Sequence, residues 1–311
     1  MTYANDVTAA IGHTPLVKIN RMLPAGTGAN VLAKMEFMNP GGSVKDRPGL
    51  AIIRAAEASG ELQPGGTIVE ATSGNTGVAL CMVGAALGYR VVISMPSSMS
   101  VERRQLMKAY GAELLLTDPA GGMAAAVEAA EDYLANHPEA VFAGQFDNPA
   151  NPEIHYRTTG PEIWEQTEGH VDAFVAGVGS GGTVSGAGKF LKEQNPEVWV
   201  VAVEPAESAL LSTGQAGAHK IQGIGANFVP DNYDSATVDE VMTVTSDDAI
   251  ETARKAATQE GLLVGISSGA NLVAAAELAA RPEFAGKTVV TLLPDTGERY
   301  LSTVLFAHLG D

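Results

Sequence analysis

The sequence predicts an α/β protein of two domains, each a mostly parallel twisted sheet flanked by helices. Strand-like and helix-like segments alternate from about residue 30 to the end, which is typical of parallel sheets covered by helices. A chain of 311 residues is long for one core, and its 45% hydrophobic content can fill two. We therefore expect two cores and two sheets.

Local patterns indicate the clearest elements. Apolar runs of strand length predict strands at 67–70, 91–95, 174–176, 198–202 and 289–293. Helical periodicity predicts helices at 101–110, 121–135, 247–259 and 269–280. Asp247 and Asp248 open the third helix, where the helix dipole favours acidic side chains. The segment 205–238 is rich in Gly, Ala and Asn and is expected to be largely irregular.

Composition limits the partners and the compartment. The net charge of −17 argues against nucleic acid and anionic membranes as partners, and no apolar stretch approaches the ~20 residues that span a bilayer. The single cysteine, Cys81, excludes an intramolecular disulfide, and no signal peptide is recognisable, so we expect a cytoplasmic protein. The histidines are scattered without close pairing, so we expect no metal site.

Lys45 follows the glycine turn Asn39-Pro40-Gly41-Gly42-Ser43-Val44 and begins a helix-patterned stretch. A helix N-terminus carries about half a positive charge, which disfavours an ammonium group and lowers the lysine pKa. A less basic lysine can act as a nucleophile or form a Schiff base. Taken alone, a surface lysine after a turn is the more common explanation.

A second informative loop, Thr72-Ser73-Gly74-Asn75-Thr76-Gly77, joins the strand at 67–70 to an apolar helix. Four short polar side chains are spaced there by glycines above a helix N-terminus, which is chemistry for holding an anion such as a carboxylate. An ordinary helix cap is the alternative, although one such residue would suffice for a cap.

A third loop, Gly177-Val178-Gly179-Ser180-Gly181-Gly182-Thr183, follows the strand at 174–176. Glycines let the backbone approach a phosphate, and the helix beginning near Gly182 points N–H groups toward it. Gly177, Gly179 and Gly182 also fit a dinucleotide fingerprint, with Glu204 about 20 residues further on. This loop alone leaves nicotinamide binding and phosphate binding about equally supported.

The three segments together indicate pyridoxal 5'-phosphate. Its aldehyde needs the lysine, its phosphate needs the glycine loop, and the amino-acid substrate needs the carboxylate loop. A nicotinamide enzyme would explain only one of the three.

The chain also resembles the cysteine synthase/cystathionine β-synthase family of fold-type-II pyridoxal-phosphate enzymes, nearly from end to end. Besides the three loops, the resemblance rests on motifs spread over the chain: 12–17, 102–104, 145–146, 148–152, 158–164, 223–225, 265–269 and 297–303. It implies a tryptophan synthase β-like fold. It also implies a smaller mobile substrate-binding domain at 41–145 and a larger cofactor-phosphate-binding domain formed by 1–40 and 146–311.

The resemblance assigns roles residue by residue. Lys45 is implied to carry the cofactor as a Schiff base and then to take the substrate α-proton. The other cofactor-binding residues implied are Asn75 at the 3′ oxygen, Gly179, Ser180, Gly181, Gly182 and Thr183 at the phosphate, and Ser267 at the pyridine nitrogen. The substrate carboxylate is assigned to Thr72, Ser73, Thr76 and Gln145. Without the resemblance, Ser267 fits equally well as a cap of the helix at 269–280.

The activity implied is that of a cysteine synthase, which converts O-acetyl-L-serine and sulfide to L-cysteine and acetate. The same cofactor serves cystathionine β-synthase, which joins serine and homocysteine, and this is the alternative. The chain lacks length for a regulatory module and an N-terminal haem-binding extension, which favours the first. O-phosphoserine is another possible donor, with Lys220 or Arg299 as the cation. A nicotinamide-dependent oxidoreductase is the alternative from another class.

Two positions depart from the family pattern. His13 stands where the family usually has Asn, and Asp295-Thr296 stand where the best-known members have two serines. Both leave room for a sister activity, since Asp295 is a candidate neighbour of the cofactor ring. The resemblance further implies a homodimer and a complex with serine acetyltransferase.

Overall fold

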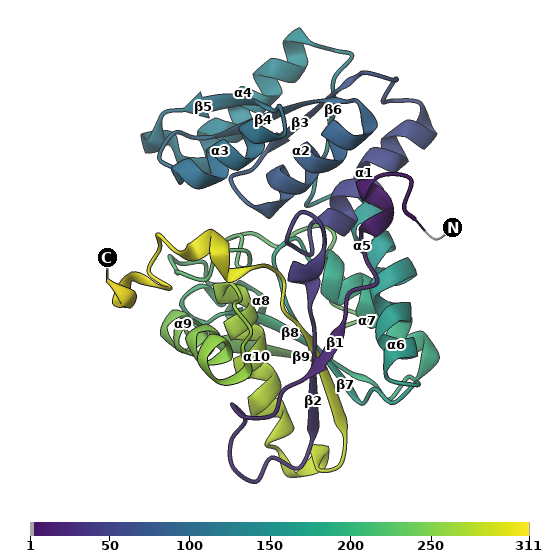
Figure 1. Ribbon diagram of the computed structural model, residues 1–311, viewed down its shortest axis with the longest axis vertical. Helices are drawn as coiled ribbons and strands as arrows, with labels where there is room; N and C mark the ends of the chain where they lie inside the picture. Colours follow the sequence, from purple (N-terminus) through teal and green to yellow (C-terminus); the bar gives the residue numbers. More distant parts are fainter. Residues whose placement is uncertain (1–2, 311) are drawn as a thin grey trace. The chain divides into compact units, whose positions relative to one another are not determined.

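The computed structural model describes residues 3–310, which divide into two compact units. The first unit comprises Asn39–Asn151 together with the N-terminal residues through Ile11. The second comprises Gly12–Met38 and the chain from Pro152 onward. Figure 1 follows the chain through both units by colour.

The first unit contains a four-stranded sheet in the order β5-β4-β3-β6, in which every pairing is parallel. Its strands are β3 (Thr67–Ala71), β4 (Arg90–Pro96), β5 (Glu113–Thr117) and β6 (Val141–Phe142). Its helices are α1 (Asp46–Ser59), α2 (Asn75–Leu87), α3 (Val101–Ala109) and α4 (Gly122–Asn136), with the 3-10 turns η1 (Val7–Ala10) and η3 (Pro119–Gly121).

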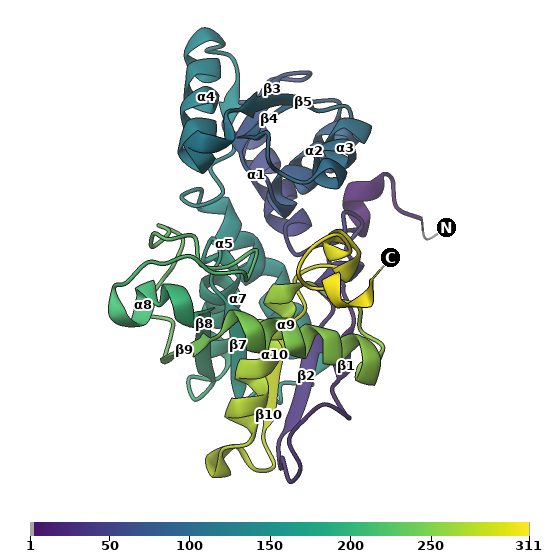
Figure 2. The same ribbon diagram turned by 90° about the vertical axis from the view of Figure 1, so that its left-hand side faces the viewer.

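Both faces of this sheet are covered, as Figure 2 shows. Ile68 on β3 packs into a cluster with Ile52 of α1 and Leu80 of α2. Its neighbour Val69 points to the other face, where it packs with Ala130 of α4. Because successive strand residues alternate between two buried faces, β3 is an uninterrupted buried run instead of an alternating one.

The second unit contains a six-stranded sheet in the order β1-β2-β10-β7-β8-β9. Its strands are β1 (Leu16–Lys18), β2 (Asn30–Lys34), β7 (Ala173–Gly177), β8 (Trp199–Pro205), β9 (Glu240–Val244) and β10 (Thr288–Leu292). Only the edge strand β1 runs antiparallel, against β2. Alternation again divides the faces: Val175 packs with Ala270 of α10, and Phe174 packs with Val184 of α7.

Helices and turns fill the connections of this part of the chain. The α-helices are α5 (Ala150–Ile154), α6 (Gly160–Gln166), α7 (Gly182–Gln194), α8 (Leu210–Thr213), α9 (Ser246–Lys255) and α10 (Ile266–Ala279). Two π-helical turns are η4 (His155–Thr159) and η6 (Ala256–Glu260). The 3-10 turns are η2 (Glu36–Met38), η5 (Ala206–Ser208), η7 (Pro282–Phe284), η8 (Gly297–Tyr300) and η9 (Ala307–Leu309).

The α/β class with parallel-rich sheets flanked by helices is confirmed. Each predicted strand and helix overlaps an observed element. One helix begins at a different residue from the one predicted. The helix expected at 269–280 begins at Ile266, so Ser267 lies inside its first turn and not in front of it.

Candidate functional site

Lys45 lies at the N-terminal end of α1, as the glycine turn predicts. Gly42 has a φ of 78°, and its N–H donates to the Asn39 carbonyl at 2.8 Å, which closes the turn. The Lys45 N–H donates to the Ser43 hydroxyl at 3.2 Å, and the half-buried Lys45 is the N-cap of α1. The ammonium group therefore belongs to a residue at the positive end of a 14-residue helix.

The loop at 72–77 joins β3 to α2 and is not a conventional helix cap. The N-cap residue is Gly74, and no side chain caps the helix. Instead the Thr72 hydroxyl accepts from the Gly74 N–H at 3.2 Å, while the Thr72 N–H donates to the Ser94 carbonyl at 3.0 Å. The helix-cap interpretation of these polar side chains is therefore wrong. Asn75 is the first residue of α2 and is half-buried.

Gln145 reaches this loop from another part of the first unit. The Thr76 hydroxyl donates to the Gln145 side-chain oxygen at 2.5 Å, across 69 positions of sequence. Both residues are buried. The structure thus brings together Gln145 and the loop that carries Thr72, Ser73 and Thr76.

Arg103 is a neighbour of this loop whose role the sequence did not predict. Its Nη1 donates to the Ser73 carbonyl at 3.2 Å. Arg103 lies on α3, so this hydrogen bond ties the loop to a second helix. The 102–104 motif was visible in the sequence, but nothing local indicated where its arginines point.

The glycine loop at 177–183 lies between β7 and α7 in the second unit. Gly181 is the N-cap of α7 and has a φ of 82°. A Cβ at Gly179 would lie 2.3 Å from the Gly223 carbonyl oxygen, and one at Gly181 would lie 2.7 Å from the Tyr233 nitrogen. Only glycine fits these close approaches to the backbone of Gly223 and Tyr233, and the loop ends at the N-terminus of α7, where helix N–H groups can bind an anion.

Ser267 lies near the same glycines. It is the second residue of α10, and Gly265 is the N-cap, so the interpretation of Ser267 as a helix cap is wrong. A Cβ at Gly223 would lie 3.6 Å from the Ser267 hydroxyl. Gly223 also lines a hollow of about 360 Å³ with residues 219–224, Thr303 and Val304.

His155 contacts the last residue of the glycine loop, a role that the sequence did not predict. It is buried in the π-helical turn η4. Its Nδ1 lies 2.8 Å from the Thr159 hydroxyl and its Nε2 lies 3.2 Å from the Thr183 hydroxyl. The imidazole therefore fixes the side chain of the last residue of the loop. Such π-helical turns occur often at functional sites, but no periodicity in the sequence signals this one.

Glu204 does not serve the dinucleotide fingerprint. Its carboxylate accepts from the backbone N–H groups of Leu211 and Ser212, at 2.7 and 2.9 Å, and from the Ser212 hydroxyl at 2.6 Å. The carboxylate thus holds the start of α8, and its hydrogen bonds go to the protein and not to a ribose. The nicotinamide interpretation loses its acidic residue.

The two departures from the family pattern have structural roles. His13 has a positive φ of 49°, a conformation that Asn adopts more readily than His, and its N–H donates to Glu162 at 3.0 Å. Asp295 is fully buried, and the Tyr300 hydroxyl donates to it at 2.6 Å. A Cβ at Gly265 would collide with the Asp295 carboxylate. Asp295 therefore lies beside the N-cap of α10, and this N-cap, Gly265, precedes Ser267 by two residues.

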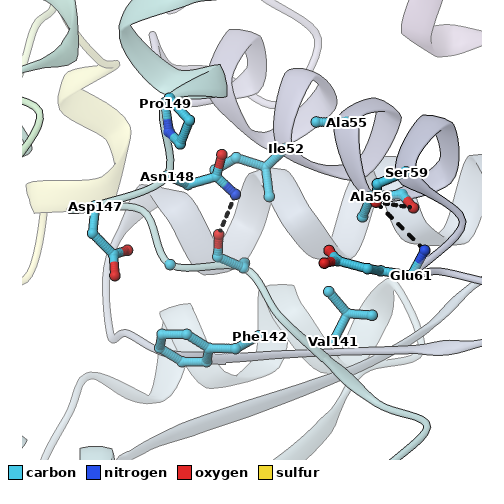
Figure 3. Close-up of a pocket in the computed structure, with 12 residues that line it drawn as sticks. Ile52, Ala55, Ala56, Ser59, Glu61, Val141, Phe142, Asp147, Asn148 and Pro149 are labelled. Atoms are coloured by element: carbon cyan, nitrogen blue, oxygen red, sulfur yellow. Dashed lines mark hydrogen bonds between the residues drawn. The ribbon is translucent and has the colours of Figure 1, made fainter.

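A separate groove of about 400 Å³ lies in the first unit (Figure 3). It is lined by Ile52, Ala55, Ala56 and Ser59 of α1, by Glu61, and by residues 141–144 and 147–149. None of the predicted site residues lines it. Two of the lining residues are joined by a hydrogen bond, which the Asn148 side chain donates to the Ala143 carbonyl at 3.0 Å.

Other reactive groups give no second site. Burial raises the pKa of the Cys81 thiol to about 12, so it is a core residue. Within residues 3–310, no three His, Cys, Asp or Glu side chains are gathered as metal ligands. In the same part of the chain, each helix is too short or too polar to span a bilayer.

The family profile of pyridoxal-phosphate dependent enzymes matches residues 7–295. The chain belongs to this family. It is 50% identical to "Cysteine synthase A" of Escherichia coli (strain K12), over 98% of this chain and 96% of that protein. The solved cysteine synthase of Entamoeba histolytica is 45% identical, covers 98% of this chain and 91% of its own, and superposes with a TM-score of 0.96. An O-acetylserine dependent cystathionine β-synthase from Helicobacter pylori is 36% identical over 98% of this chain and all of its own, with a TM-score of 0.91.

A pyridoxal-phosphate dependent enzyme needs a lysine for the aldehyde of the cofactor and backbone N–H groups for its phosphate. The glycine loop at 177–183 ends at the N-terminus of α7, where helix N–H groups can bind a phosphate, and Gly179 and Gly181 pack against the backbone of Gly223 and Tyr233 where a Cβ would not fit. The lysine is the N-cap of α1. The residues present therefore fit the cofactor, and the cofactor is pyridoxal 5'-phosphate.

Proposed function

We propose that this chain is a cysteine synthase, a transferase that replaces the acetoxy group of O-acetyl-L-serine with sulfide. The observation that carries the proposal is the nearly full-length identity with cysteine synthase A, at half of all positions. The products are L-cysteine and acetate. The C–O bond at the β-carbon breaks, acetate leaves with its electron pair, and sulfide supplies the pair of the new C–S bond.

The cofactor supplies an electron sink that stabilises negative charge at the substrate α-carbon. In our proposal Lys45 attaches the cofactor through Nζ and takes the α-proton as a general base. Its place at the head of α1 supports this role, because the helix dipole favours the neutral amine that both tasks require. Asn75, the first residue of α2, is proposed to bind the 3′ oxygen of the cofactor.

The cofactor phosphate is proposed to bind the loop that ends in the N-terminus of α7, through Gly179, Ser180, Gly181, Gly182 and Thr183. Ser267 is proposed to bind the pyridine nitrogen. A hydroxyl does not keep that nitrogen protonated as a carboxylate would. The electron sink is then weaker, which favours prompt loss of a β-leaving group over racemisation or transamination.

The substrate carboxylate is proposed to bind Thr72, Ser73, Thr76 and Gln145. Support comes from the hydrogen bond between Thr76 and Gln145, which gathers these donors at one place in the first unit. Two or three charge-assisted hydrogen bonds of about 1.5–3 kcal/mol each would select amino acids.

Finer features of the resemblance remain part of the proposal. We propose that the first unit, which contains residues 41–145, acts as a mobile substrate-binding domain and that the second unit forms the cofactor-phosphate-binding domain. We also propose a cytoplasmic homodimer that binds serine acetyltransferase.

A product assay tests the function. Purified protein with pyridoxal phosphate is offered O-acetylserine, O-phosphoserine or serine, each with sulfide or homocysteine. We expect the highest kcat/KM with O-acetylserine and sulfide, and cysteine as the product. Cystathionine formed faster from serine and homocysteine would instead make the chain a cystathionine β-synthase. Preference for O-phosphoserine would direct attention to Lys220 and Arg299; the Lys220 ammonium lies 3.5 Å from Asp247 in an exposed ion pair.

A further inference from the structure

A buried carboxyl group stands directly before the proposed carboxylate-binding loop. Glu70 is the fourth residue of the fully buried strand β3 (Thr67–Ala71) and is 2% exposed. Its Oε1 accepts from the Ala71 N–H at 2.9 Å, and its Oε2 accepts from the Gln145 N–H at 3.2 Å. The first bond holds the strand end that leads into Thr72. The second crosses 75 positions of sequence to reach Gln145.

Gln145 makes hydrogen bonds through its N–H, its carbonyl and its side-chain oxygen. Glu70 accepts from its N–H, the Asn151 side chain donates to its carbonyl at 2.8 Å, and the Thr76 hydroxyl donates to its side-chain oxygen at 2.5 Å. The segment that carries it is also closed on itself by the bond from Asn148 to the Ala143 carbonyl (Figure 3). The position of the Gln145 amide relative to Thr76 therefore depends on the Glu70 carboxylate.

We propose that Glu70 is a positioning residue for the substrate carboxylate, because it holds the Gln145 backbone against the 72–76 loop. The inference rests on the proposed function, since it concerns the same substrate site. Glu70 need not touch the substrate. It acts through Gln145 and through the strand end that precedes Thr72.

The charge of Glu70 decides whether this clamp is complete. A carboxylate accepts from both N–H groups through charge-assisted bonds, whereas a protonated carboxyl is neutral and accepts more weakly, above all at the oxygen that carries the hydrogen. Burial raises the Glu70 pKa to about 7, and Asp147 adds to the rise, while the N–H groups of Gln145, Ala71 and Gly144 oppose it. The clamp is thus complete above neutral pH and incomplete below it.

Helix α1, which packs on the Ile68 face of β3, carries the buried Asp46 and Arg47, the exposed Arg54 and the half-buried Glu57. The paired residue on β4 is Ile93. The helix α2 carries Cys81, which is buried and holds its proton. The helix α4, on the other face, carries Glu128, Glu131 and Asp132 at exposed positions and Tyr133 and His137 at half-buried ones. Asp147 is the neighbouring charge that raises the Glu70 pKa, and it is the charge that the test changes.

The test uses glycine, an amino acid that has no β-leaving group and therefore cannot be converted to cysteine. Glycine is titrated into the cofactor-loaded protein while the visible absorbance of the cofactor is followed. Glu70→Gln keeps the shape but can accept only one of the two bonds. We expect its glycine Kd to be about tenfold above wild type at pH 8, equivalent to one hydrogen bond to a charged group. At pH 6, where wild-type Glu70 is protonated, we expect the two Kd values to agree within about twofold. The titration of glycine itself is the same in both experiments and cancels in this ratio.

Two further variants make the test specific. Glu61→Gln removes an exposed carboxylate of the same unit and should leave the Kd at its wild-type value at both pH values. Asp147→Asn, at an exposed position, should bind glycine more tightly than wild type near pH 7 and equally at pH 8.5, because it lowers the Glu70 pKa. This mild variant also answers the question if Glu70→Gln fails to fold.

Each outcome has one meaning. A Kd ratio between Glu70→Gln and wild type that is equal at pH 6 and pH 8, or no pH-dependent effect of Asp147→Asn, overturns the role of Glu70. A wild-type protein that neither responds to glycine nor forms cysteine overturns the proposed function, and the role of Glu70 with it. A wild-type protein that does both, with the ratio falling from pH 8 to pH 6, supports both.

Discussion

At the scale of single residues, Lys45 is proposed both to attach the cofactor and to take the substrate α-proton. Its replacement therefore tests both proposed roles at once. Lys45→Ala deletes a nucleophile and a general base together, and we expect cysteine formation to fall by at least ~10³-fold. Lys108→Ala is the matched control, because Lys108 is an exposed lysine on α3 of the same unit. Turnover of Lys45→Ala within tenfold of that control would place the essential amine elsewhere.

Glu70 also predicts how stability changes with pH. Its pKa of about 7 in the folded protein exceeds the ordinary value of 4.5, so the folded state binds the proton more tightly. The resulting stabilisation is present below pH 4.5 and is lost as pH rises through about 7; it amounts to about 3 kcal/mol at most. Glu70→Gln cannot titrate.

The measurement is the unfolding temperature of wild type and Glu70→Gln at pH 5.5, 6.5 and 7.5. We expect the wild-type value to fall relative to the variant as pH rises. Other titrating groups are common to both proteins and cancel in the difference. A difference that stays constant over this range would contradict the shifted pKa.

At the scale of elements, the loop from β7 to α7 should tolerate no side chain. Gly181→Val would place its Cβ 2.7 Å from the Tyr233 nitrogen, in a backbone with φ of 82°. We expect much weaker retention of pyridoxal phosphate on dialysis, with the circular dichroism largely unchanged. Gly214→Val is the control, because Gly214 has a φ of 75° but nothing within 4 Å of its Cβ position. Equal cofactor content in the two variants would mean that the phosphate binds elsewhere.

The loop from β3 to α2 should affect the substrate and spare the cofactor. Thr72→Ala and Ser73→Ala are each expected to weaken O-acetylserine binding by about 10- to 100-fold, the scale of one charge-assisted hydrogen bond. The cofactor absorbance without substrate should not change. Ser98→Ala removes an exposed hydroxyl of the same unit and should bind normally. If all three variants share one titration midpoint, the carboxylate does not bind this loop.

At the scale of the whole molecule, stability should depend on the cofactor. A ligand that binds only the folded state stabilises it by about 3–4 kcal/mol at 100 to 1,000 times its Kd. Removing pyridoxal phosphate should therefore lower the unfolding temperature by several degrees, and adding it back should restore the loss. Lys45→Ala should respond less to added cofactor. Equal unfolding temperatures with and without cofactor would contradict tight binding to the folded chain.

Much of the fold could be predicted because its determinants are local. The strand runs at 67–70 and 174–176 are continuously buried, without a polar face exposed to solvent, because both faces of each sheet are covered. Acidic Asp247 and Asp248 mark the start of α9. The error at α10 was also local: Ser267, Ser268 and Gly269 interrupt the helical period of apolar residues, so the prediction began this helix at residue 269 although it begins at Ile266.

The sequence by itself determined the α/β class, the glycine turn before Lys45 and the two polar loops at helix N-termini, because backbone conformation and helix ends depend on neighbouring residues. Only the tertiary structure decided which distant side chains meet. Gln145 reaches Thr76 and Glu70, and His155 reaches Thr183, because strand order and loop path bring them together. The engagement of Glu204 with the start of α8 was decided in the same way. Side-chain contacts across 69 or 75 positions leave no local pattern, because nothing in their own neighbourhoods specifies the partner.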